Sequence, residues 1–316
     1  MSTGAPARID LHCHLAPPEY LARIPTAIRN ALPTWSFQQL SSDMERFEID
    51  AAVLSVGPPG VHFGDSDEAA GLARWVNEWA ADLIRREPRR FGALASLPLP
   101  DVDKALAEVT YALDELQLDG VVLYTNHAGI YLGDDRFEPL LEELDRRGTY
   151  VFVHPGWPPN EQPLPQHPAW LYEFPFDTTR CITNLVYSGA LDRHRNIRFQ
   201  FAHLGGTALF LADRLASLAD REPELAAGAS ERFTDYLRNF YYDTGLCNHV
   251  EPIQAASARS APGRVGFGSD FPYAHLPAEG NDPVPGLAHL GETHLIGLFS
   301  DAARDLVPRL GATHES

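Results

Sequence analysis

The chain has 316 residues, of which 44% are hydrophobic and 22% charged, so it has the composition of a globular protein with a large core. Its formal net charge of −18 argues against nucleic acid or an anionic membrane as a partner, because binders of polyanions carry clustered lysine and arginine. The three cysteines, Cys13, Cys181 and Cys247, have no CxxC spacing, which argues against a disulfide framework or a thiolate zinc site.

Short runs of β-branched and aromatic residues alternate with segments of helical periodicity, the pattern of a parallel sheet covered by helices. The eight predicted strands are residues 8–15, 51–56, 91–99, 120–125, 150–154, 197–203, 240–245 and 264–270. The clearest helices are predicted over residues 67–86, 103–116, 137–147, 178–191 and 207–218. Eight such units predict one (β/α)8 TIM barrel, distorted by loop insertions, as a single domain over residues 1–316.

Three irregular segments follow predicted strands, namely residues 17–37, 156–175 and 272–285. The second is rich in proline and tryptophan and too long for a simple βα turn, so we interpret it as a lid or wall. Residues 1–8 lack the apolar region of a signal peptide, and no later window is apolar enough for a membrane span. We therefore expect a soluble, cytoplasmic protein.

Histidines and a carboxylate recur at the C-terminal ends of the predicted strands, where barrel enzymes assemble their catalytic residues. Asp10, His12 and His14 alternate along the first strand, so one face would carry both imidazoles. His154 and Asp270 end the fifth and eighth strands. Packing histidines would not be distributed in this way, and we predict a metal site.

Imidazoles and one carboxylate suit zinc, manganese, iron or cobalt, and the residue types do not choose among them. With His12, His14, His154 and Asp270 as ligands, a position stays open for water or a chelating substrate. His203, at the end of the sixth predicted strand, could then act as general acid or base or complete the coordination.

Five motifs together resemble the amidohydrolase-related decarboxylases, a family that includes aminocarboxymuconate semialdehyde decarboxylase and the resorcylate- and methylsalicylate-type enzymes. They are Ile-Asp-Leu-His-Cys-His at 9–14, Val-His-Pro at 153–155, Ala-His-Leu-Gly-Gly at 202–206, Tyr-Asp-Thr at 242–244 and Phe-Gly-Ser-Asp-Phe-Pro at 267–272. Other segments are most similar to the methylsalicylate type, including Glu-Phe-Pro-Phe-Asp-Thr-Thr-Arg at 173–180. The resemblance implies a distorted barrel with one zinc or manganese ion.

By this resemblance His12, His14, His154 and Asp270 are the metal ligands and His203 is the histidine beside the metal-bound oxygen. As catalytic residues, His203 or Asp270 could deliver the proton. Arg214 matches an arginine that reaches the substrate of a neighbouring subunit, which implies a functional homodimer. Ser42 stands where the aminocarboxymuconate enzyme has a second substrate-binding arginine, so a dicarboxylate substrate is disfavoured.

Several other residues allow two interpretations. Arg180 could bind a substrate carboxylate or form a local ion pair beside an Asp177 helix cap, and Trp157 could wall an aromatic pocket or pack the insertion. Asp10 could influence the metal or bond to the backbone, while Asp243 could orient a ligand or cap a turn.

Three functions remain open at this point. The first is non-oxidative decarboxylation of an aromatic hydroxy acid, with protonation of the ring carbon and loss of CO2. The second is hydrolysis of a lactone, ester or amide by water activated at the same site. The third is a non-catalytic barrel with a structural ion, which the wide spacing of the ligands disfavours.

Overall fold

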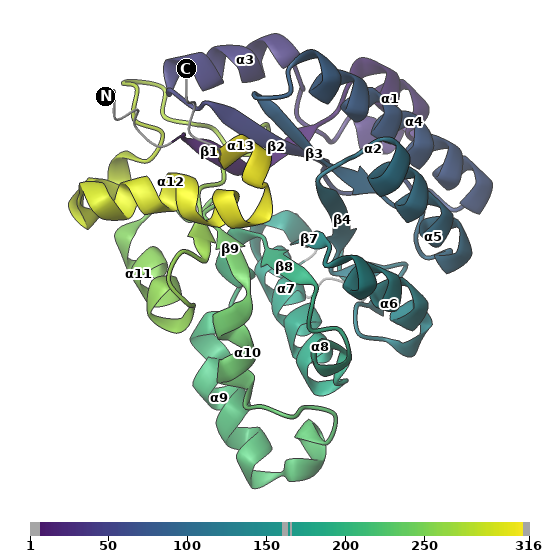
Figure 1. Ribbon diagram of the computed structural model, residues 1–316, viewed down its shortest axis with the longest axis vertical. Coiled ribbons are helices and arrows are strands. Elements are labelled where there is room, and N and C mark those ends of the chain that lie inside the picture. Colours follow the sequence, from purple (N-terminus) through teal and green to yellow (C-terminus); the bar gives the residue numbers. More distant parts are fainter. Residues whose placement is uncertain (1–6, 160–163, 165, 312–316) are drawn as a thin grey trace.

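The computed structural model describes residues 7–159, 164 and 166–311 and contains an eight-stranded parallel barrel (Figure 1). The strand order β1-β2-β3-β4-β7-β8-β9-β10 follows the chain. These strands are Ile9–Leu15, Ala51–Val56, Phe91–Ser96, Gly120–Tyr124, Tyr150–His154, Arg198–Phe201, Tyr241–Asp243 and Val265–Gly266. A bridge between Cys13 and Phe271 joins the first strand to the segment after the last, with the N–H of Leu11 donating to the carbonyl of Phe267 at 2.9 Å.

Helices surround the strands, with α4, α5 and α6 covering one side of the barrel and α9, α11 and α12 another (Figure 1). The α-helices α1 to α7 are Pro18–Arg23, Thr26–Arg29, Phe37–Arg46, Ser66–Arg86, Val102–Thr110, Glu138–Arg147 and Ala169–Tyr187. The α-helices α8 to α13 are Ala190–Arg193, Ala208–Arg221, Phe233–Asn239, Val250–Arg259, Glu292–Leu306 and Pro308–Gly311. The short η segments are the π-helix Tyr111–Glu115 and the 3-10 helices Asp135–Phe137, His203–Gly205, Pro223–Ala226 and Pro285–Leu290.

A small hairpin follows β4 and lies outside the barrel sheet. Its strands, β5 (Asn126–His127) and β6 (Ile130–Tyr131), are antiparallel and pair Asn126 with Tyr131. The turn between them uses Ala128 and Gly129, both with positive φ, a conformation that glycine adopts without steric cost.

The predicted (β/α)8 barrel is confirmed, and the predicted strands occur in their predicted order. Five of them end earlier than predicted, at Ser96, Tyr124, Phe201, Asp243 and Gly266. Proline at 98 and 100 stops the third strand, since it cannot donate to a ladder. His203 therefore begins a 3-10 helix beyond its strand and Asp270 lies in the segment after β10, and both have positive φ, 53° and 57°.

The segment over residues 156–175 is less irregular than predicted. Helix α7 begins at Ala169, includes Pro175, and ends at Tyr187, whereas the sequence predicted residues 178–191. Proline removes one helical N–H donor, but the adjoining turns continue, with the Thr179 hydroxyl donating to the Pro175 carbonyl at 2.8 Å. Asp177 is consequently an interior helical residue and not a cap.

Two further parts of the chain depart from the sequence prediction. The segment at residues 17–37, predicted as irregular, contains the short helices α1 and α2. The helices α3, α10, α11 and α12 were not among the clearest helices given residue ranges from the sequence. In the described ranges 7–159, 164 and 166–311, no helix combines the length and apolar character that crossing a membrane would require.

Candidate metal centre

Four buried side chains converge at the C-terminal end of the barrel: His12 and His14 from β1, His154 from β7, and Asp270 from the segment after β10. One ligand-type atom from each lies within 4.8 Å of the others. The Nε2 atoms of His12 and His14 are 3.1 Å apart, and each lies within 3.2 Å of the Asp270 Oδ1 atom. The structure thus brings together all four residues of the predicted ligand set.

The first strand presents both histidines through an irregularity in its register. Asp10 pairs with Ala52 and Cys13 with Leu54, so three steps along β1 match two along β2. This bulge breaks the alternation between Asp10 and His12, which the sequence interpretation had placed on one face. Asp10 instead accepts the backbone N–H of His12 and of Ser269, each at 3.0 Å. Burial raises the pKa of Asp10 to about 6 despite these bonds.

Each of the three imidazoles is oriented through its Nδ1 atom. That atom of His12 lies 2.7 Å from the Asp243 Oδ1 atom, and that of His154 lies 2.9 Å from the Pro155 carbonyl oxygen. The Nδ1 atom of His14 lies 3.3 Å from the Ser55 carbonyl oxygen. A proton on Nδ1 in each ring leaves the Nε2 lone pair directed into the group, as in metal-ligating histidines.

The buried Nε2 atom of His154 has no hydrogen-bond partner among the described residues. A buried polar atom without a partner is costly, and here it lies where the other two imidazoles and the Asp270 carboxylate meet. A divalent cation would satisfy all four groups together, so these residues fit a metal ion.

Asp243, the last residue of β9, organises the centre from behind His12. Its Oδ1 atom also accepts the N–H of His203 at 3.2 Å and of Gly245 at 3.0 Å, while Gln200 donates to Oδ2 at 2.8 Å. A Cβ atom at Gly245 would lie 2.8 Å from the His12 Nδ1 atom, so this close approach requires glycine. Asp243 therefore orients a candidate ligand, which is one of the two interpretations that the sequence allowed.

The electrostatics of the centre favour binding of a cation. Burial alone would lower the pKa of His12, but the Asp243 and Asp270 carboxylates raise it to about 10. Burial lowers the pKa of His14 and, with the neighbouring histidines, that of His154. Burial would raise the pKa of Asp270, but the surrounding histidines hold it well below its usual range. Metals bind ionised carboxylates and neutral imidazoles, so a cation bound here would displace the proton that the raised pKa keeps on His12.

His203 lies beside this group. Its Nε2 atom is 3.2 Å from the Asp270 Oδ2 atom, whereas His12 and His14 contact the other carboxylate oxygen, Oδ1. His203 and Asp270 both hold the left-handed backbone conformation that non-glycine residues rarely adopt. Such strained residues cluster at functional sites, where surrounding contacts hold them in place.

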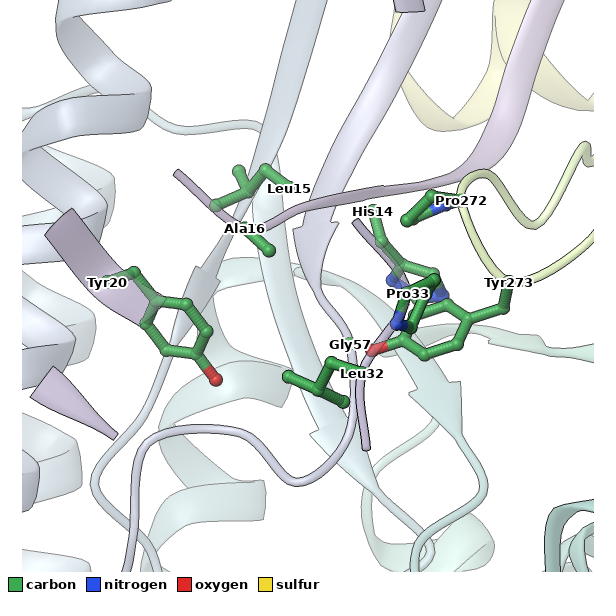
Figure 2. Close-up of a pocket in the computed structure, with 9 residues that line it drawn as sticks. All are labelled: His14, Leu15, Ala16, Tyr20, Leu32, Pro33, Gly57, Pro272 and Tyr273. Carbon is green, nitrogen blue, oxygen red and sulfur yellow. The ribbon is translucent and has the colours of Figure 1, made fainter. Parts of the chain in front are cut away.

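A small pocket borders His14, and Figure 2 shows the Tyr273 ring beside that histidine. The two ring centroids are 5.2 Å apart and the rings are edge-on. The Tyr273 hydroxyl donates to the Pro58 carbonyl at 3.2 Å, and a Cβ atom at Gly57 would lie only 2.8 Å from the Tyr273 ring. The sequence interpretation missed Tyr273, which follows Asp270 by three residues and could have been found by that proximity.

A larger cleft of about 400 Å³ is lined in part by Pro58, the residue after Gly57 of the small pocket. Its walls come from the β2–α4 loop, the β5–β6 hairpin and the segment after β7. The lining residues are Pro58, Pro59, His62, Leu99, Tyr124, Asn126, His127, Ala128, Gly129, Gly156, Trp157 and Pro159. The cleft thus begins two residues after His154, and its described lining includes no lysine, arginine, aspartate or glutamate.

The predicted substrate-binding residues occupy different surroundings. Trp157 lines the cleft. The Arg180 guanidinium lies 3.3 Å from a Glu173 oxygen and 3.6 Å from an Asp177 oxygen. Arg214 is exposed on α9 and makes no hydrogen bond or ion pair with other residues that the structure describes. Ser42 is exposed on α3 and lines neither hollow.

Residues 9–309 match the family model described as amidohydrolase. The chain is 35% identical to the decarboxylase yanB of Aspergillus niger, over 96% of this chain and 88% of the relative. It is 34% identical to the 6-methylsalicylic acid decarboxylase of Penicillium expansum, over 85% of this chain and 86% of the relative.

The fold is also similar to a solved structure of a dihydroxybenzoic acid decarboxylase from a Polaromonas species. That structure contains manganese and the inhibitor 2-nitroresorcinol. The TM-score is 0.80 and the sequence identity 21%, with 95% of this chain and 96% of that chain covered.

Proposed function

This chain belongs to the amidohydrolase family, and we propose that it is a metal-dependent decarboxylase of an aromatic hydroxy acid, most specifically a 6-alkyl salicylate. The observation that carries the proposal is the convergence of three Nε2 atoms and one carboxylate, with the His154 Nε2 atom left without a protein partner. Relatives named as decarboxylases supply the reaction class.

We propose that His12, His14, His154 and Asp270 hold one divalent ion, zinc or manganese. The ion would bind the substrate carboxylate together with an ortho oxygen and stabilise the negative charge that develops on them. A para-hydroxybenzoate cannot chelate in that way, so the position of the hydroxyl should decide reactivity.

The protein's own part in the reaction is to hold and deliver a proton. His203 and Asp270 share a contact at 3.2 Å, and we propose that this pair delivers the proton to the ring carbon that bears the carboxylate. A C–H bond then forms at that carbon, the bond to the carboxylate breaks, and CO2 leaves as aromaticity returns. The fixed backbone of both residues would keep the acid in line with one ring carbon.

The cleft beside the centre suits an uncharged ring substituent. Proline, leucine and tryptophan side chains form much of its lining, and the described part of that lining offers no cation for a second carboxylate. Monocarboxylates should therefore react better than dicarboxylates.

Hydrolysis of a lactone, ester or amide was the alternative for the same ligands. The relatives are named as decarboxylases, so the comparisons do not favour it. Incubation of the metal-loaded protein with 6-alkyl salicylates in D2O tests the choice by mass spectrometry. We expect a phenol carrying deuterium at the carbon that lost CO2. Efficient opening of lactones or amides, without CO2 from any salicylate, would replace the decarboxylase with a hydrolase.

We further propose that the protein acts as a homodimer in which Arg214 serves the partner's substrate. Support comes from the exposed position of Arg214 on α9, one turn after Phe210, whose side chain is 88% exposed. Mixing Arg214→Ala subunits with His12→Ala subunits should restore part of the activity that each variant lacks. A fully active monomer would exclude this arrangement.

A further inference from the structure

Asp177 is a fully buried carboxylate that takes no part in the metal centre. Its Oδ2 atom accepts the Thr125 hydroxyl and, at 3.0 Å, the Asn126 amide, while its Oδ1 atom accepts the Tyr131 hydroxyl. All three donors lie in residues 125–131, the segment that leaves β4 and forms the β5–β6 hairpin. A buried carboxylate needs such donors to offset its desolvation, so the hairpin and α7 are held together at this point.

Two of these donors also hold the segment after β7. The Thr125 hydroxyl oxygen accepts the Gly156 N–H at 2.9 Å, and the Asn126 amide donates to the Trp157 carbonyl at 2.9 Å. Asn126, Gly156 and Trp157 all line the cleft, as does Gly129, whose N–H donates to the Asn126 side-chain oxygen at 3.1 Å. The Asp177 carboxylate therefore lies behind two walls of the cleft without lining it.

Helix α7 also supports the Trp157 ring. Phe174, one turn before Asp177, packs edge-on against Trp157 with ring centroids 5.4 Å apart. The same phenylalanine contacts His154, with centroids 6.3 Å apart. Trp157 is thus fixed from its backbone through Asn126 and from its ring through Phe174, and both contacts depend on the placement of α7.

We propose that Asp177 is a positioning residue that sets the separation of the hairpin and Trp157 walls, and so the affinity for the substrate ring. It would act through Thr125 and Asn126 and touch neither the substrate nor the metal. The inference rests on the proposed function only in taking the cleft as the place where the ring of the substrate binds.

The chain offers a control with similar hydrogen-bond partners in Asp192 of α8. This carboxylate accepts the Tyr236 hydroxyl at 2.5 Å and the Ser230 hydroxyl at 2.5 Å, and it contacts an arginine three residues later, Arg195. Asp177 has similar partners, a tyrosine hydroxyl, a threonine hydroxyl and Arg180 three residues later, but its side chain is fully buried, whereas that of Asp192 is 17% exposed. Asp192 lines neither the pocket nor the cleft.

The test compares Asp177→Asn with Asp192→Asn as metal-loaded enzymes acting on a 6-alkyl salicylate. We expect Asp177→Asn to raise KM roughly 10-fold or more, because the hydrogen bonds that hold the two walls are weakened, while kcat and metal content stay near wild type. Hydrogen–deuterium exchange should become faster at Gly156 and along residues 125–131. Asp192→Asn should leave both KM and exchange at these positions unchanged.

A second pair of variants guards against misfolding of Asp177→Asn. Thr125→Val keeps the side-chain shape but loses the hydroxyl that joins Asp177 to Gly156, and Thr125→Ser keeps that hydroxyl. The valine variant should reproduce the rise in KM and the faster exchange, and the serine variant should restore wild-type values. If neither KM nor exchange changes in the valine variant, or if kcat and metal content fall together, the positioning role is wrong. Absence of CO2 release by the wild type would reject the proposed function, while the exchange comparison would still decide the role of Asp177.

Discussion

The metal centre and the cleft beside it are neighbours built from different kinds of structure. In the centre, His12, His14 and His154 are strand residues, and each ring is fixed through its Nδ1 atom by a group of the barrel or its rim. The cleft is lined instead mainly by loops and by the β5–β6 hairpin, whose strands have two residues each. The difference teaches that the barrel determines the chemistry of the site, while contacts among its loops determine which ring can reach it.

The two regions also differ in charge. The centre contains coupled ionisable groups, and its carboxylates raise the pKa of His12 to about 10 even though burial alone would lower it. The described lining of the cleft has two histidines as its only basic side chains, and burial lowers the pKa of His127 to about 3. A cation suits the first region and an uncharged ring suits the second.

Removal of a ligand should give the largest effect and would test whether the centre acts as one unit. We expect Asp270→Asn and His154→Ala each to lose bound metal and to lower kcat/KM by more than about 100-fold, since outer partners of a metal site alone contribute 10- to 100-fold. Both residues lie at the barrel rim, so circular dichroism should be unchanged. Metal stoichiometry is the direct measurement, and full occupancy with near-wild-type rates in both variants would remove these residues from the ligand set.

The sequence predicted the centre better than the cleft for a physical reason. His12, His14 and His154 belong to strands, and the order of strands around a parallel barrel follows from their order in the chain. The alternation argument failed only at Asp10, because a bulge in β1 cannot be read from residue types. His203 and Asp270 were placed at strand ends but lie beyond the strands, since the strands stop earlier.

The cleft depends on contacts that have no local signal in the sequence. Asp177 binds Thr125, which lies 52 residues earlier in the chain. Pro175 led to the prediction of an irregular segment, yet α7 continues through it, and this hid the helical position of Asp177. Asn126 and His127 could be placed after β4 from the sequence, but not in a hairpin.

Asp243→Asn should have an intermediate effect and would show how far the barrel itself sets the centre. The substitution keeps the size of the side chain but removes the charge that His12 contacts at 2.7 Å. We expect metal affinity to fall about 10- to 100-fold while the fold is retained. Titration with zinc or manganese under competition from a chelator measures the change. Wild-type affinity would mean that His12 needs no orienting carboxylate.

Trp157→Ala should have a smaller effect, confined to substrates that use the cleft. Trp157 is 47% exposed and supplies part of the cleft's apolar lining. We expect KM for a 6-alkyl salicylate to rise roughly 10-fold, whereas KM for unsubstituted salicylate and the metal content should change little. Steady-state kinetics on the two substrates gives the comparison. An equal rise for both would show that the tryptophan contacts the common ring and does not select the substituent.

The smallest expected effect concerns stability in acid and tests whether the cleft excludes charge. The His127 Nε2 atom accepts the Tyr124 N–H at 3.2 Å, and its ring packs near Phe137. Burial, with a smaller contribution from His62, lowers its pKa from 6.5 to about 3. Between these values the unfolded chain binds a proton that the folded chain does not, so stability is present above the unfolded pKa and is lost as the pH falls.

From about pH 8 to about pH 6 the free energy of unfolding should fall by under about 1 kcal/mol on this account. The loss is small because pH 6 lies only slightly below the pKa of the histidine in the unfolded chain. His127→Gln keeps an acceptor for the Tyr124 N–H but cannot titrate, so its stability should fall less than that of the wild type over this range. Urea unfolding at the two pH values measures the difference, with His167→Gln, at an exposed position, as the control. If the His127→Gln curve parallels the wild-type curve, His127 is protonated as readily in the folded chain as in the unfolded one, and the cleft tolerates a cation.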